Sequence, residues 1–308
     1  MDEVTSTREL TDRLLDSYRT LGGINHLDGK NLPSRQAVGR ITSDLLRLLF
    51  PGFFDESAIA TAAVRSATSE LLDEVAGRLG REIGRSLEYE PPPELPDKDP
   101  ATAARMLAME FLARLPNLRE LLATDVEAAF NGDPAALSKE EVIVAYPFVE
   151  AIAAQRMAHE LYLRNIALIP RMMTEWTHGR SGIDLHPGAT IGTHFFVDHC
   201  TGTVVGETAV IGNHVKMYQG VGLVARSLAA GQQLRGKKRH PTIEDNVTIY
   251  AGATIVGGET VVGEGSTIGA NAFLLHSVPA HSLVLADDVK VKVLSKEAPR
   301  DPPPDWVI

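Results

Sequence analysis

Two segments in the second half of the chain hold most of the residue types that could do chemistry. Residues 183–208 read IDLHPGATIGTHFFVDHCTGTVVGET, and residues 236–243 read GKKRHPTI. The first contains His199 and the second a basic pair, Arg239 and His240. A neutral imidazole near pH 7 can remove the proton of an attacking hydroxyl group. A lone histidine is more often held by a backbone carbonyl, so the surrounding pattern has to decide between the two interpretations.

That pattern has a period of six. Every sixth residue from Leu185 to Val221, and again from Ile243 to Phe273, is apolar or threonine. This period is typical of a hexapeptide repeat, in which three flat sides form one coil and the repeated residue points inward. A chance alternation in an antiparallel sheet would not hold its register for so long. The two runs are out of phase with each other, which predicts a loop at about 224–242 that leaves the coil.

The residues before the repeat have a different composition. Leu, Ala, Arg and Glu recur there with helical spacing, and most of the 26 glycines come later. Helices are expected over 57–88, over 101–130 and from about Ser138 to Trp176. The last of these should begin with a capping box, in which Ser138 and Glu141 satisfy each other's backbone groups.

The predicted fold class is therefore α+β. An α-helical domain over 1–180 contains a linker-like proline-rich segment at 90–100, where helix is excluded. A left-handed parallel β-helix of hexapeptide repeats follows over 181–288, and an extended tail over 289–308. A flat-sided coil favours packing against copies of itself, so we expect a homotrimer or a dimer of trimers.

Three motifs in order connect this coil to a known family. DLHPGATIG, DHCTGTVVGET and KRHPTI resemble the signature of the serine acetyltransferases, and the resemblance covers about residues 120–280, including the weaker NGDPAA. It implies direct transfer of an acetyl group from acetyl-CoA to L-serine, without an acyl-enzyme, as the first step of cysteine biosynthesis. Acetyl-CoA is then a cosubstrate, and no metal is expected.

The resemblance also implies roles for individual residues. For catalysis and L-serine binding they are His199 as general base, Asp184 as the carboxylate that fixes its tautomer, Asp198 and Asp133 for the ammonium group, and Arg239 and His240 for the carboxylate. Each has a plainer alternative: Asp184 and Asp133 could be turn residues, and Arg239 could belong to a solvated basic loop.

For CoA, the family uses backbone groups at the positions of Ala251 and Gly252. Lys237 and Lys238 are candidates for the CoA phosphates because of their charge. The loop before the KRHP motif is longer than is usual in the family and lacks its double glycine. Cys200 stands where a small apolar residue is usual, and it could be a nucleophile or a small buried residue.

Three other functions remain as alternatives. The coil could belong to another acyltransferase that acts on an amino sugar or other hydroxyl group. It could be a carbonic anhydrase with zinc on His194, His199 and His214. It could also be a noncatalytic scaffold, since a fold alone does not fix a function.

Charge and composition limit the partners. The 308 residues carry a formal net charge of −10, which argues against a nucleic-acid partner. No apolar run is long enough for a membrane span, and the first residues have no signal-peptide pattern. With a single cysteine, the chain is expected in the cytoplasm. The tail ends in Ile308, like the tails with which many members of the family bind O-acetylserine sulfhydrylase, so this enzyme is a possible partner.

Overall fold

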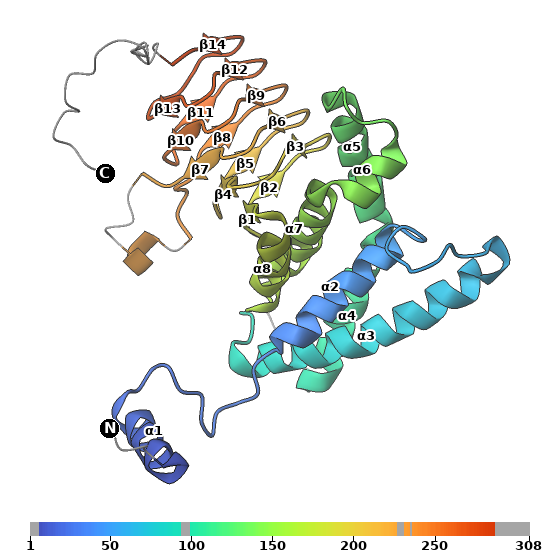
Figure 1. The fold of residues 1–308 in the computed structure, drawn as a ribbon, viewed down its shortest axis with the longest axis vertical. Helices are drawn as coiled ribbons and strands as arrows, with labels where there is room; N and C mark the ends of the chain where they lie inside the picture. The colour runs from blue at the N-terminus through green and yellow to red at the C-terminus, as the bar shows by residue number, and fades with distance from the viewer. Residues whose placement is uncertain (1–5, 94–98, 227–230, 235, 287–308) are drawn as a thin grey trace, which may run out of the picture.

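The computed structural model describes residues 6–93, 99–226, 231–234 and 236–286, and places a group of helices beneath a three-sided coil of strands (Figure 1). The described helices are α1 (Thr7–Thr20), α2 (Arg35–Leu49), α3 (Val64–Tyr89), α4 (Pro100–Leu112), α5 (Leu115–Gly132), α6 (Lys139–Ala145), α7 (Pro147–Leu163) and α8 (Ile169–Ser181). Short 3₁₀ turns lie at Thr61–Ala63 and Gly231–Leu234. Helices α7 and α8 lie next to the first coil, whereas α1 buries none of its residues.

The helix boundaries differ from the predicted ones where proline and local capping act. The helix predicted over 57–88 begins only at Val64, because Ala60 is extended. The helix expected from Ser138 to Trp176 is three helices, and prolines in the first turn start the second and the third. The Ser138 side chain caps α6 as predicted, but the Glu141 carboxylate accepts the N–H of Leu137 instead of completing the box.

The strands form three parallel sheets, one for each side of the coil. The first sheet contains β1 (Asp184–Leu185), β4 (Val204–Val205), β7 (Gly222–Val224), β10 (Thr254–Val256) and β13 (Phe273–Leu274). The second contains β2 (Thr190–Ile191), β5 (Val210–Ile211), β8 (Thr242–Ile243) and β11 (Val261–Val262). The third contains β3 (Phe196–Val197), β6 (Lys216–Met217), β9 (Thr248–Ile249), β12 (Thr267–Ile268) and β14 (Leu283–Val284). The chain visits the sheets in turn, as expected for a left-handed β-helix.

The register of the repeat corrects the prediction. The inward strand residues are Leu185, Ile191, Val197, Val205, Ile211, Met217, Leu223, Ile243, Ile249, Ile255, Val262, Ile268 and Leu274. From Thr203 to Val221 the predicted series falls on the second buried residue of each side, two positions before the inward strand residue, so it is buried as predicted but shifted by two. From Val261 to Phe273 the series is wrong by one residue and falls on side chains that are not buried. The corner at residues 198–203 contains two extra residues, and the corner after Val256 contains one. Phe273, predicted to point inward, is 66% exposed.

Polar side chains of α7 satisfy the open edge of the first coil. Gln155 donates to the carbonyl of Ala189 at 2.9 Å, and Arg156 donates to those of Ile191 and Gly192 at 3.1 and 2.7 Å. Unpaired strand edges invite association with other chains, and buried carbonyls need donors. The helical domain therefore covers the first coil and also provides hydrogen-bond donors to its open carbonyl groups.

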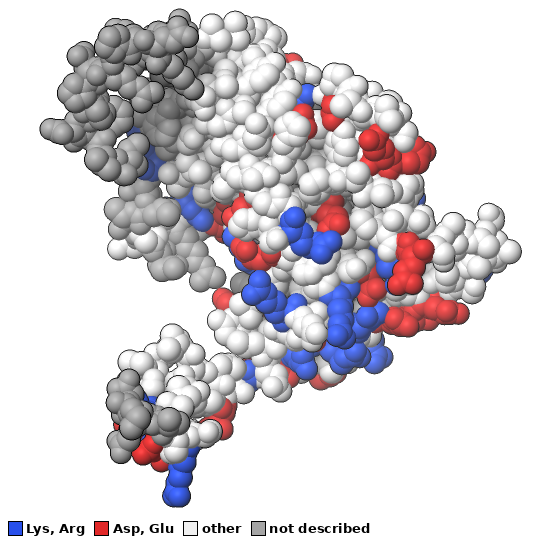
Figure 2. Space-filling view, in the orientation of Figure 1, with Lys and Arg blue, Asp and Glu red and all other residues white. Residues whose placement is uncertain are grey.

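On the face shown in Figure 2, the Lys, Arg, Asp and Glu side chains lie mainly over the helical part, with both signs next to one another. The coils above them show few charges in this view. Among the described helices, none is long and apolar enough to cross a membrane.

Candidate active site

His199 lies at a strained corner of the β-helix. Strand β3 ends at Val197, and the chain turns through residues 198–203 to reach the first sheet. His199 and Cys200 both have left-handed backbones, with φ of 59° and 57°. Such conformations cost non-glycine residues on the order of 1–3 kcal/mol each and gather at functional sites. The turn holds the imidazole outside the prism, where its side chain is 69% exposed.

Asp198 and Cys200 flank this histidine and differ in what they can do. Asp198 is 8% exposed, and its Oδ1 lies 3.6 Å from Nδ1 of His199. Among the residues that the structure describes, no group donates a hydrogen bond to the Asp198 carboxylate. Burial, with a smaller effect of Asp198, raises the pKa of Cys200 to about 12. The thiol is therefore protonated near neutral pH, which argues against a cysteine nucleophile.

Asp133 is held in front of this corner by two residues that the sequence analysis did not identify. It ends α5, and its Oδ2 accepts a hydrogen bond from the Tyr146 hydroxyl. This bond, with the N–H of Ala135, lowers the pKa of Asp133, and it raises the pKa of Tyr146 to about 12. Lys216 donates to the carbonyl of Gly132, which ties the end of α5 to the second coil. We call Asp133, Tyr146, Asp198, His199 and Lys216 the His199 cluster.

The second group of predicted residues gathers at another corner, where the long loop rejoins the coil. Arg239 forms an ion pair with Glu207. The ring of His240 lies against Gly206, and a Cβ added to that glycine would lie only 2.0 Å from the ring. The Thr208 hydroxyl accepts the N–H groups of Arg239 and His240 at 2.9 and 3.0 Å. The sequence Gly-Glu-Thr at 206–208 thus binds both Arg239 and His240, so the two motifs contact each other in the fold.

Two imidazoles at this corner are held neutral in a fixed tautomer. The N–H of Thr208 donates to Nδ1 of His240, and the N–H of Gly188 donates to Nδ1 of His186. Burial, then the charge of Arg239, lowers the pKa of His240 to about 4, and burial also lowers that of His186. Because Nδ1 accepts in both rings, each carries its proton on Nε2 and can donate it to a ligand.

A cavity of about 530 Å³ opens beside this corner, lined in part by His186, Glu207 and Tyr162. Tyr162 donates to Glu207 at 2.7 Å. Burial acts to raise the pKa of Glu207, but the bonds from Tyr162 and Arg239 outweigh it and lower the value. The corner therefore presents an ionised carboxylate, a guanidinium and two neutral donors.

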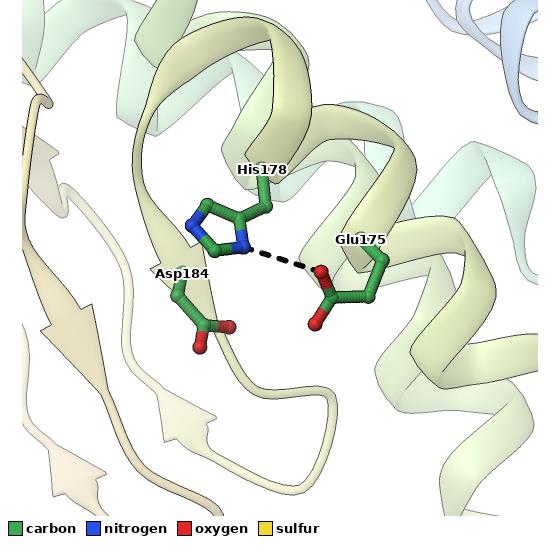
Figure 3. Close-up of side chains that lie close together, drawn as sticks. All are labelled: Glu175, His178 and Asp184. Carbon is green, nitrogen blue, oxygen red and sulfur yellow. Dashed lines mark hydrogen bonds and ion pairs between the residues drawn. The ribbon is translucent and has the colours of Figure 1, made fainter. Parts of the chain in front are cut away.

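Asp184 lies on the same side of the molecule as this second group. It shares one face of β1 with His186, because alternate strand residues point the same way and Leu185 between them is buried. Arg171 of α8 binds its two oxygens at 3.0 and 3.3 Å. Figure 3 shows its carboxylate beside Glu175 and His178, which come from α8. We call Asp184, His186, Glu207, Arg239 and His240 the His240 cluster.

The two clusters stay apart within one chain. The His199 cluster lies at the corner between the third and first sheets, and the His240 cluster lies at the corner between the first and second sheets. In the described part of the chain, no contact joins His199 to Asp184, Arg239 or His240. The structure thus brings Asp133, Asp198 and His199 together, and separately Asp184, Arg239 and His240.

The residues expected to bind CoA have mixed surroundings. Backbone bonds of the coil engage the N–H of Gly252 and the carbonyl of Ala251. Among the described residues, the N–H of Ala251 and the carbonyl of Gly252 have no such partner. Lys238 donates to the carbonyls of Thr208 and Pro241, and burial lowers its pKa. Lys237 is exposed.

The three histidines of the zinc alternative do not meet within one chain. The rings of His194 and His214 stack at the corner between the second and third sheets, with centroids 4.2 Å apart, whereas His199 lies at another corner. In the described ranges, the three side chains that could hold a metal are Glu175, His178 and Asp184. Arg171 already contacts both carboxylates there, so a guanidinium supplies the positive charge.

Curated relatives of the chain are serine acetyltransferases. The plasmid serine acetyltransferase of Synechococcus elongatus is 43% identical over 260 residues, which cover 82% of this chain and 81% of the relative. The serine acetyltransferase of Mycobacterium tuberculosis is 43% identical over 182 residues, covering 59% of this chain and 76% of the relative. No family model matches the chain.

Solved structures agree as well. Serine acetyltransferase isoform 3 of Entamoeba histolytica, in complex with cysteine, superposes with a TM-score of 0.72 at 30% identity and covers 94% of this chain and 95% of that one. The Neisseria gonorrhoeae enzyme, in complex with serine, gives a TM-score of 0.53 at 26% identity and covers 87% of this chain and 100% of that one. These likenesses show that the chain belongs to the serine acetyltransferase family.

Proposed function

We propose that this chain transfers an acetyl group directly from acetyl-CoA to the hydroxyl of L-serine, with His199 as the general base. The family is one of acyltransferases that acetylate serine. In this mechanism the imidazole of His199 removes the hydroxyl proton as the oxygen attacks the thioester carbonyl. CoA leaves as its thiol and O-acetyl-L-serine forms. Cys200 takes no part, because its thiol is buried and protonated.

The observation that carries this proposal is the Asp198 carboxylate. Its side chain is 12% exposed, and among the described residues no group donates a hydrogen bond to the carboxylate, whose oxygens still reach solvent. A ligand that displaces this solvent must replace its hydrogen bonds, so a cationic group is the expected partner of the carboxylate when the site is occupied. The ammonium group of an amino acid would supply that cation next to the exposed imidazole. Asp133, held by Tyr146, would accept a second hydrogen bond from the same group.

The carboxylate of the substrate needs the opposite kind of partner, which the His240 cluster offers. Arg239 carries the charge, and His240 presents a neutral Nε2–H. Because each cluster supplies one half of what a zwitterion needs, we propose that a complete site forms between adjacent chains of a trimer. In that arrangement Asp184 of one chain would face His199 of the next and fix its tautomer, as in other His-Asp pairs.

Acetyl-CoA would lie along the later coils in the groove between chains. The free N–H of Ala251 and carbonyl of Gly252 support this placement, since pantetheine carries amides that can bond to both. Lys237 is the better candidate for a phosphate, because Lys238 is already engaged by two carbonyls. No metal enters the proposed reaction.

The first experiment measures CoA release from acetyl-CoA with and without L-serine, against a panel of other hydroxyl acceptors. His199→Ala should lower kcat by about 100-fold or more, the usual contribution of a general base. His214→Ala is the matched control, since His214 is also an exposed histidine with a left-handed backbone at a coil corner. Equal kcat for His199→Ala and the unmodified chain would refute the role of His199, and release that ignores serine would refute the acceptor.

Three predictions about partners, location and assembly stay predictions. The C-terminal segment 289–308 lies outside the described residues, so binding of O-acetylserine sulfhydrylase through Ile308 is tested by deleting that residue and measuring binding to the sulfhydrylase. A cytoplasmic location remains a prediction from the single cysteine. The trimer, or dimer of trimers, is open to mass measurement in solution.

A further inference from the structure

A line of alternating charges runs along α8 and ends at Asp184. Nδ1 of His178 lies 3.2 Å from Oε2 of Glu175, and Oε1 of Glu175 lies 2.5 Å from the Arg171 guanidinium. The same guanidinium donates from two nitrogens to the two oxygens of Asp184, at 3.0 and 3.3 Å. Figure 3 shows the Glu175, His178 and Asp184 side chains of this group, with the contact between His178 and Glu175 as a dashed line.

We propose that Arg171 is a positioning residue that holds the Asp184 carboxylate in the orientation needed to bind the His199 ring of the adjacent chain. This inference rests on the proposed function. A fork with two parallel hydrogen bonds fixes the plane of a carboxylate, which a single ammonium cannot do. An ionised carboxylate has about four acceptor sites, so two remain after the fork is formed. One of them can accept the ring N–H of a histidine without loss of the contact with Arg171.

The surroundings of Arg171 support a holding role over a merely structural one. Its side chain is 41% exposed and Asp184 is 20% exposed, so the pair lies at the surface of the first sheet. Surface ion pairs contribute little to stability, typically below about 1 kcal/mol. Glu175 contacts one of the two nitrogens that form the fork with Asp184, which restrains the guanidinium further. The arrangement therefore adds order to one carboxylate more than it adds stability to the fold.

The same contacts argue against a metal ion at this place. The ligand atoms of Glu175, His178 and Asp184 lie within 4.8 Å of one another, a spacing that a divalent cation could use. The guanidinium of Arg171 is already bonded to both carboxylates, and a second cation would be repelled by it. Arg171 thus takes the place that a metal would fill.

The test replaces Arg171 and follows kcat and KM separately by CoA release. Arg171→Ala should lower kcat roughly 10- to 100-fold, as a misplaced catalytic group does, while KM for L-serine and acetyl-CoA changes little. Arg171→Lys should recover only part of the loss, because it keeps the charge but not the fork. Guanidinium chloride, far below denaturing concentrations, should raise the kcat of Arg171→Ala. Arg180→Ala is the matched control, since Arg180 lies on the same helix as Arg171 and makes a similar two-point pair with Glu150 of α7.

A double substitution separates positioning from structure. If Arg171 acts through Asp184, then Arg171→Ala combined with Asp184→Asn should be no slower than Asp184→Asn alone. Additive losses, or an Arg171→Ala that matches Arg180→Ala, would overturn the inference. Failure of the proposed function would look different: the unmodified chain would then show no serine-dependent release, or His199→Ala would be as active as the unmodified chain. An active chain that needs His199 but not Arg171 would reject this inference alone.

Discussion

His240 shows how the fold sets the state of a single side chain. Its Nδ1 accepts from the N–H and hydroxyl of Thr208, and its ring fills the space above Gly206. Burial then lowers its pKa to about 4, from an ordinary value of about 6.5. The imidazole is therefore a neutral donor throughout the neutral pH range, which suits its proposed role of binding a carboxylate without taking up a proton.

This lowered pKa predicts a stability change with pH. As the pH falls below about 6.5, the unfolded chain binds a proton at His240 but the folded chain does not, until the pH approaches about 4. Above about pH 6.5 the contribution of neutral His240 to the free energy of unfolding is complete. Between about pH 6.5 and about pH 4 this contribution is lost as the pH falls, by at most about 1.4 kcal/mol per pH unit, and by less where solvent screens the ring.

His240→Asn should reduce this dependence, because the amide oxygen can still accept the N–H of Thr208 but does not titrate. Urea unfolding at about pH 7 and about pH 5 measures the difference. His214→Asn, at an exposed corner, should keep the pH dependence of the unmodified chain. The same slope in His240→Asn and the unmodified chain would contradict the lowered pKa.

Single residues also show where sequence is enough and where it is not. The adjacency of Asp198 and His199 is visible in the sequence, and so is the order of the Gly-Glu-Thr and Arg-His-Pro motifs. The partner of Asp133 is not, because Tyr146 lies between α6 and α7 and the whole of α6 separates the two residues in the sequence. Arg171 was missed for the same reason: its contact with Asp184 depends on the angle at which α8 meets the first coil. Spacing predicts contacts within an element far better than contacts between elements.

At the scale of elements, the junction between α7 and the first coil is a chemical cap. Arg156 is 5% exposed and pairs with Asp125, which is 1% exposed, at 2.7 Å. The same guanidinium satisfies two carbonyls of the coil edge, and Asp125 accepts the N–H of Phe195. Burial raises the pKa of Asp125, against the effect of Arg156. The pair thus supplies hydrogen bonds to backbone groups of the first coil that would otherwise lack a partner.

Removing one partner of this pair should be costly. Arg156→Met leaves a buried carboxylate without its counter-charge, which typically destabilises by about 3–5 kcal/mol. Arg180→Met, which breaks a more exposed pair with Glu150, should cost less than about 1 kcal/mol. Urea unfolding compares them. Adding Asp125→Asn to Arg156→Met should recover part of the loss, and equal stability of the two single variants would show that the cap is unimportant.

The coil itself explains why its periodicity predicted the fold but not the register. Each side buries two residues, the inward strand residue and a small one two positions earlier, such as Val205 and Thr203. Both series of buried residues are apolar or β-branched. Counting every sixth residue therefore cannot detect a shift of two positions from one series to the other. The shift occurs at residues 198–203, where two left-handed residues lengthen the corner. The lengthened corner that shifts the register is also the corner that exposes the His199 side chain.

For the whole molecule, the first sheet separates the two halves of the site. Its face lies between the corner of His199 and the corner of Arg239 and His240, and no described contact bridges them within one chain. A flat-sided prism can bring such corners together only by packing against a copy of itself. If the packing is cyclic, every interface joins the His199 corner of one chain to the His240 corner of its neighbour. The proposed site and the proposed trimer therefore rest on the same observation, the separation of the two corners within one chain.

Mixed oligomers can test this directly. His199→Ala and His240→Ala chains should each be nearly inactive alone, because every interface lacks one half. When equal amounts are co-refolded, about one interface in four combines an intact His199 corner with an intact His240 corner, so roughly a quarter of the unmodified activity should return. Mixing the folded variants without exchange of chains serves as the control and should restore nothing. Because a site built within one chain cannot be repaired by a neighbour, co-refolded mixtures that stay inactive would show that each chain carries its own complete site.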